Sequence, residues 1–211
     1  KRAEVAFAKN HIKDLTKITS IFVPKIINKQ INKIFAEGEI EGEFIIPFDS
    51  NGNIENDYGF SGKIVDARIN ITKEFFIKDL TTEINHRKVE TANLFNIAIK
   101  KGSFLDFDLT DSIFKLRSEN NEINVKSLLK KRGEFNFSKI KKISSLLNFN
   151  IDNIKNIEGK TDLKTNIDFK LNKNYRIKNL IYLIEGKIPY SEIYFHEKKI
   201  IKQYLPNYKD T

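Results

Sequence analysis

The stretch Ile157–Tyr190, IEGKTDLKTNIDFKLNKNYRIKNLIYLIEGKIPY, predicts the fold of most of the chain. In its first half, apolar residues share one parity and polar residues occupy the other, which is typical of a strand with one dry face and one wet face. The apolar set is Leu163, Ile167, Phe169 and Leu171. The polar turn 172–174 then leads into a second strand from Tyr175 to Ile188. The stretch therefore predicts a long β-hairpin.

The same period of two recurs through the chain and predicts an antiparallel meander. Asn51-Gly52 lies between two such segments, and this dipeptide is a strong hairpin signal. The expected strands are Ile40–Phe48, Phe60–Thr72, Leu80–Ile84, Val89–Ile99, Phe104–Leu109, Ile113–Leu116, Glu122–Val125 and a last one through Ile193 and Phe195. The segment 100–103 is expected to separate two of them.

Two helical regions are predicted beside the strands. Apolar residues recur every three or four positions between Ala3 and Ala36, and Pro24 divides this region into two helices. A short helix is expected near 138–148, with Ser138 as its N-cap. The domain prediction is therefore a helical segment, 1–37, followed by a β segment, 38–211, that contains the short helix.

Composition limits the remaining possibilities. The 211 residues carry a net charge of +9 at a pI near 9.4, and they include no Cys and no Met. The absence of Met leads us to expect a segment of a longer protein. The mean hydropathy of -0.43 fits an elongated, surface-rich β structure. The basic charge has two readings, which are a general preference for Lys and a selected surface that attracts phosphates.

No catalytic or metal-binding pattern is evident. His11, His86 and His196 have no partner at metal-ligand spacing, and there is no Gly-rich phosphate loop. Asp106 and Asp108 share one side of an expected strand, as the wet residues of any amphipathic strand would. We therefore expect no enzyme activity, no metal and no cofactor. Nucleic acid is not expected as a partner either, because no RNP-type motif is present.

Long strands with one apolar face need something to cover that face. The sheet can close as a barrel, pair as a sandwich or curl into an open trough. A trough lined by Ile, Phe, Leu and Val would suit acyl chains and would need no catalytic group. The residue pattern leaves these three architectures open.

Three blocks of sequence resemble the AsmA-like superfamily of bacterial envelope proteins, most closely its YhdP-like branch and more distantly TamB. The first is Gly59–Ala67, GFSGKIVDA, and the second is Arg132–Phe135, RGEF, leading into the short helix. The third begins with Ile157–Lys160, IEGK, and continues through Ile167–Leu171, IDFKL, to Ile184–Ile188, IEGKI. The resemblance extends over about Glu39 to Ile193, and Lys170-Leu171 stands where the family commonly has Pro-Leu.

The resemblance implies a mainly β fold, an elongated and curved meander that forms an open groove. It also implies transport of phospholipid between inner and outer membranes without catalytic residues. The location would be the periplasm, with tethering to the inner membrane through an N-terminal anchor that precedes this segment, and with other envelope proteins as further partners.

The leading hypothesis is a bridge-like lipid-transfer segment whose apolar strand faces shield acyl chains. The alternative is a non-catalytic scaffold or assembly factor of the outer membrane that binds a protein partner through its sheet edge and apolar face. The expected groove-lining residues are Phe44, Ile46, Val65, Ala67, Ile69, Ile71, Leu163, Ile167, Phe169 and Leu171.

Overall fold

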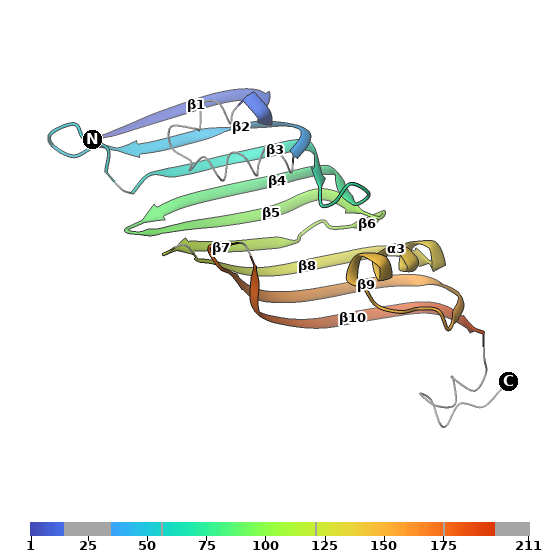
Figure 1. The fold of residues 1–211 in the computed structure, drawn as a ribbon. Coiled ribbons are helices and arrows are strands. Elements are labelled where there is room, and N and C mark those ends of the chain that lie inside the picture. Colours follow the sequence, from blue (N-terminus) through green and yellow to red (C-terminus); the bar gives the residue numbers. More distant parts are fainter. Residues whose placement is uncertain (15–34, 56, 121, 175, 197–211) are drawn as a thin grey trace. The chain divides into compact units, whose positions relative to one another are not determined.

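The computed structural model describes residues 1–14, 35–55, 57–120, 122–174 and 176–196. In this part of the chain, ten strands form one sheet in the order β1-β2-β3-β4-β5-β6-β8-β9-β10, and β7 pairs with β5 and β8 (Figure 1). The elements are β1 Arg2–His11, β2 Phe35–Pro47, β3 Gly59–Asn70, β4 Phe76–Val89, β5 Ala92–Phe104, β6 Phe107–Asp108, β7 Ile113–Glu119, β8 Glu122–Asn136, α3 Phe137–Leu147, β9 Ile154–Leu171 and β10 Ile177–Phe195. The prediction of a mainly β, antiparallel chain is confirmed.

The hairpin predicted from the opening stretch is present as β9 and β10. Its turn is held by the side chain of Asn172, whose Oδ1 accepts hydrogen bonds from the backbone N–H groups of Asn174 and Arg176, both at 3.0 Å. The turn at Asn51-Gly52 uses the same device, since Asp49 Oδ1 accepts from the N–H groups of Asn51 and Asn53 at 2.8 Å. Both turns are local, which is why sequence alone could identify them.

The prediction of N-terminal helices is wrong at the start and at the end of the predicted helical region, the two parts of it that the structure describes. Arg2–His11 is strand β1, which pairs with β2 in a register that places Val5 opposite Phe44, and β2 already begins at Phe35. Pairing between distant segments overrides the local helical spacing here. Residues 12–14 are helical, and the rest of the predicted helical segment, 15–34, lies outside the described residues.

The predicted separator at 100–103 is also wrong, because β5 continues to Phe104. Strand β8 likewise runs on to Asn136, well past the predicted end at Val125. Both regions contain charged residues, and a sheet can keep such residues within a strand on its solvated face.

The chain divides into two compact units, and strands β8, β9 and β10 each contribute to both. The first unit comprises residues 1–131 and 164–185, and the second comprises 132–163 and 186–211. The predicted short helix is α3 in the second unit. Its N-cap is Asn136 rather than Ser138, since Asn136 Oδ1 accepts from the N–H of Lys139 at 3.0 Å, and Asn148 ends the helix with a φ of 54°.

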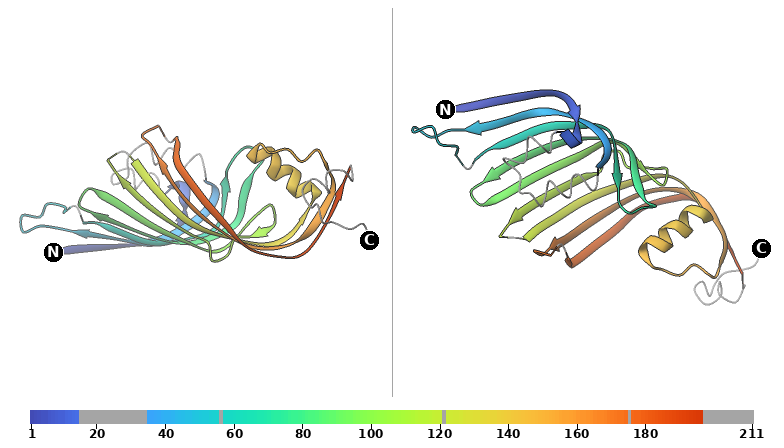
Figure 2. Two further views of the ribbon diagram at one scale, coloured as in Figure 1. Left: turned by 90° about the horizontal axis from the view of Figure 1, so that it is seen from below. Right: turned by 45° about the horizontal axis from the view of Figure 1, so that its top comes forward.

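In the first unit, a line of β-bulges crosses strands β2 to β5. Between Ile64 and Ala67, strand β3 contains one more residue than β4, and β4 regains this residue before Ile77. Asp66 and Asp79, the residues at these two positions, have left-handed φ values of 48° and 53°. Because bulges bend and twist a strand, the strands of this unit curve along their length (Figure 2).

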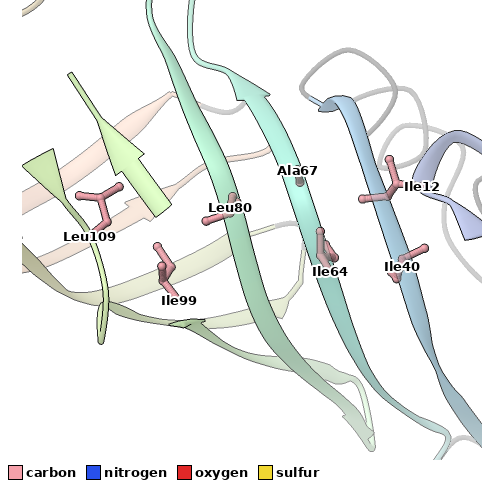
Figure 3. Packing of buried hydrophobic residues seen from close by; sticks show 7 residues of the cluster. All are labelled: Ile12, Ile40, Ile64, Ala67, Leu80, Ile99 and Leu109. Carbon is pink, nitrogen blue, oxygen red and sulfur yellow. The ribbon is translucent and has the colours of Figure 1, made fainter. Parts of the chain in front are cut away.

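The buried core of the first unit lies along this bulge line (Figure 3). Ile64 and Ala67 both belong to it although three positions separate them, because the extra residue at Asp66 returns Ala67 to the same face. Ala67 is completely buried, and a Cβ at Gly38 would come within 2.7 Å of the Ala67 Cβ. The members of the core are Ile12, Ile40, Ile64, Ala67, Leu80, Ile99 and Leu109.

Gly62 generates a testable prediction, because the Phe60 ring lies over it. A Cβ at Gly62 would overlap this ring and would come within 2.7 Å of the Glu41 carbonyl oxygen. We expect Gly62→Val to lower the free energy of unfolding by about 1–3 kcal/mol, measured by chemical denaturation. Ser61→Val places the same side chain on the exposed opposite face and should change it by less than about 0.5 kcal/mol. Equal stability of the two variants would contradict this role for the ring.

Candidate functional site

One face of the first unit carries an apolar row that crosses five strands. The pairing register aligns Phe60 of β3, His86 of β4, Phe95 of β5, Leu116 of β7 and Val125 of β8. Residues opposite one another in an antiparallel sheet point to the same face, so these side chains form a continuous band. The first four are half-buried and Val125 is buried.

The band continues beyond β3 as an aromatic cluster. The Phe44 ring centroid lies 5.0 Å from that of Phe60 and 5.8 Å from that of Phe7. Phe7 also stacks with Phe60 at 6.2 Å and an interplanar angle of 8°. A second apolar row runs beside the first, in which Ile84, Ile97 and Phe114 are aligned. The face thus offers aromatic and aliphatic surface over seven strands.

His86 is the titratable member of the apolar row. Its ring lies 4.5 Å from that of Phe95, and its Nε2 is 3.0 Å from Asn93 Oδ1. Burial lowers the pKa of His86 below its usual 6.5, while the hydrogen bond to Asn93 opposes this shift and the nearby charge of Lys88 adds to it. The neutral imidazole is therefore favoured, which keeps the band uncharged.

The opposite face of the same strands is polar and hollowed. Two rows of side chains occupy it, Ser61–Asn85–Asn96–Lys115–Lys126 and Gly59–Arg87–Leu94–Arg117–Asn124. These residues, together with Ile45, Asp57, Asp168 and Lys170, line a hollow of about 1090 Å³. Phe60, His86, Phe95 and Leu116, which lie between the two rows in sequence, also border it, although the register directs their side chains to the apolar face. This part of the sheet is therefore amphipathic, with the apolar band on one face and a basic hollow on the other.

The predicted lining residues have different positions in the structure. Phe44 and Ile46 are half-buried on β2, and Ala67 and Ile69 belong to or pack against the core. Val65 lies just before the bulge, opposite Glu39, and is not part of the core cluster. Ile71 follows the end of β3 and is 49% exposed. The four predicted residues of β9 are all half-buried, namely Leu163, Ile167, Phe169 and Leu171.

The residues of the apolar row itself were not among the predicted lining residues. Phe60 and Ile64 are even-numbered, whereas the expected set in this strand was odd-numbered. The change of parity between Ile64 and Ala67 marks the bulge, and an Asp between apolar residues was the available signal. Phe95 and Leu116 lay in predicted strands but were not assigned to the site.

Asp106 and Asp108, the two carboxylates expected on one side of a strand, have structural partners. Asp106 lies in a turn with a φ of 62°, and its Oδ1 is 3.0 Å from Lys78 Nζ. Asp108 Oδ1 accepts hydrogen bonds from the N–H and Oγ1 of Thr110 at 2.9 and 2.6 Å. Among the described residues, no group of three His, Cys, Asp or Glu side chains is arranged to hold a metal ion. No helix in the same part of the chain has the length and hydropathy of a membrane span.

Comparison of the chain with known protein families, with characterised proteins and with solved structures found no match.

The position of His86 predicts a pH-dependent stability. Because its pKa is lower in the folded than in the unfolded chain, its contribution is complete above pH 6.5 and is lost as the pH falls through the folded pKa. Between about pH 7.5 and about pH 5.5, the wild-type denaturation midpoint should fall more than that of His86→Leu. Urea denaturation at both pH values checks this. Parallel pH profiles for the two proteins would contradict an imidazole held neutral in the band.

Proposed function

We propose that this chain is a segment of a bridge-like carrier of the bacterial envelope, whose apolar sheet face holds phospholipid acyl chains as they pass between the membranes. The observation that supports this proposal is the band of half-buried Phe60, Phe95 and Leu116, aligned across neighbouring strands. The open groove and the periplasmic location, with a tether to the inner membrane, are parts of the same proposal.

The physical basis is burial of hydrocarbon against hydrocarbon. Each methylene group that moves from water onto an apolar surface gains about 0.8 kcal/mol, so a chain lying along several strands would be held without any specific contact. When His86 is neutral the band has no charged member, so a lipid tail can cover it without burying a charge. The headgroup would stay in water.

This binding mode requires no chemistry from the protein. The polar group of the band is His86, and the buried hydroxyl of Thr82 lies on the same face two rows away. Neither is given a catalytic role. Movement of lipid would occur by sliding along a face of similar character from strand to strand. We therefore propose transport without an enzymatic step.

A pair of adjacent residues on opposite faces provides the test. A photo-reactive amino acid at Phe95 should crosslink to phospholipid in bacterial cells, whereas the same amino acid at Asn96 should not, because Asn96 belongs to the polar row. Crosslinked lipid is detected by mass spectrometry of the purified protein. Positions Ile69 and Phe169 extend the test to the predicted lining residues.

Phe95→Glu gives an independent measurement. A carboxylate in the band should lower the amount of co-purifying phospholipid at least about tenfold, because covering a charge with hydrocarbon is unfavourable. Asn96→Glu introduces the same charge on the exposed polar face and should leave the lipid content unchanged, with circular dichroism confirming that both variants are folded. Equal crosslinking at positions 95 and 96, or equal lipid content in the two Glu variants, would argue against the proposal.

The edge strand β10 supports the scaffold function as a second candidate. In the described part of the chain, β10 has a neighbour on one side only, which is β9. Its apolar side chains are exposed on both faces, with Ile181 at 68% and Tyr182 at 64%. An unpaired edge with exposed hydrophobic residues is the kind of surface to which an extended segment of another protein adds as a further strand.

The two candidates respond differently to a change at this edge. Ile181→Lys with Leu183→Lys should abolish binding of an added strand and should leave crosslinking at Phe95 unaltered if lipid transfer is the function. Pull-down of envelope proteins with wild-type and double-variant chains, together with the crosslinking yield, checks this. Loss of both readouts would favour a role in which edge pairing is required for lipid to reach the band.

A further inference from the structure

The polar face of the first unit contains an unfavourable pairing that points to a ligand. Lys115 of β7 lies directly opposite Lys126 of β8, and like charges in this arrangement destabilise a sheet. Arg117 is two positions further along the same face of β7, and Lys170 lines the same hollow. Four cationic side chains thus gather on three neighbouring strands.

The local carboxylates compensate only part of this charge. Arg117 Nη2 is 2.7 Å from Glu119 Oε2, and Lys126 Nζ is 3.5 Å from Asp168 Oδ2. Arg87 is a fifth cation of the hollow and lies in the same row as Arg117. Five cations of the hollow thus have three carboxylates near them, which are Asp57 and Asp168 in the lining and Glu119 beside Arg117, and a surplus of positive charge remains.

We propose that this hollow binds a compact polyanion that carries several phosphate groups on a non-aromatic carrier, such as a phosphorylated sugar or polyol. The cations would each meet a phosphate oxygen. The amides of Asn85, Asn96 and Asn124 line the same space and add hydrogen-bond donors. A bound polyanion would relieve the repulsion between Lys115 and Lys126.

The distribution of aromatic residues excludes bases as the recognised group. Binding of single-stranded nucleic acid combines cations with aromatic side chains on which bases stack. Phe60 and Phe95 border the hollow, but the pairing register assigns their rings to the apolar row, which points to the other face. The hollow therefore offers charge and hydrogen bonds without a stacking platform, which fits a phosphorylated carbohydrate or polyol.

The inferred site is independent of the proposed lipid function because the two occupy opposite faces of the same strands. Phe95 and Asn96 are neighbours in sequence, and the register directs their side chains to opposite faces. Substitutions in the hollow should leave lipid crosslinking at Phe95 unchanged, so failure of one proposal is distinguishable from failure of the other.

Titration calorimetry with inositol hexakisphosphate tests the inference on the full chain. We expect saturable binding that weakens with added salt. Lys115→Gln with Lys170→Gln should weaken it at least about tenfold, because two charge-assisted contacts are lost. The matched control is Lys63→Gln with Lys73→Gln, two exposed lysines outside the hollow, which gives the same net charge and should change the affinity less than about twofold. Thermal denaturation confirms that both variants are folded.

Two further arms identify the carrier. Vesicles of phosphatidylcholine with and without phosphatidylinositol bisphosphate show whether phosphates on a lipid headgroup are bound as well as free ones, and either source supports the site. An oligothymidylate of ten nucleotides should bind more weakly than the polyol phosphate. The proposal would be overturned if neither inositol hexakisphosphate nor the phosphatidylinositol bisphosphate vesicles bound. Equal losses of affinity in the two double variants, or tighter binding of the oligonucleotide, would also overturn it.

Discussion

Cross-strand register is the constraint on which this structure depends. A strand side chain can point to only two faces, so the pairing of one strand with the next determines which residues form a common surface. Because β3, β4, β5, β7 and β8 are aligned, Phe60, His86 and Phe95 belong to one row and Ser61, Asn85 and Asn96 to the next. A shift by one residue would exchange the two faces and remove both surfaces at once.

The register also explains how one sheet can carry an apolar surface and a basic surface. The apolar band and the basic hollow are back to back and share the same backbone, so each strand contributes alternately to both. Neither surface needs a catalytic group, and both follow from placing side chains of one kind in rows. The proposed functions accordingly rest on extended surfaces rather than on a few reactive atoms.

Sequence reasoning recovered what is local and missed what depends on pairing. The hairpin of β9 and β10 could be predicted because alternation and the turn at Asn172 are encoded in neighbouring residues. Strand β1 could not, since its partner β2 lies beyond the intervening segment and its own spacing resembles a helix. The band was only partly found, because the bulge at Asp66 changes the parity of β3. The basic hollow was not found, because it draws residues from seven strands whose register was unknown.

The compensated bulges have a consequence for how this sheet can change in length during evolution. The additional residue at Asp66 in β3 is balanced by one at Asp79 in β4, so the strands are back in step by the pairing of Ile69 with Ile77. Loss of Asp66 alone would leave Ile64 and Ala67 two positions apart and on the same face, and loss of Asp79 alone would likewise restore regular pairing between Leu80 and Ile77. A single-residue deletion should therefore be accepted at these two positions, whereas a deletion elsewhere in the strands would exchange the faces of all the residues beyond it.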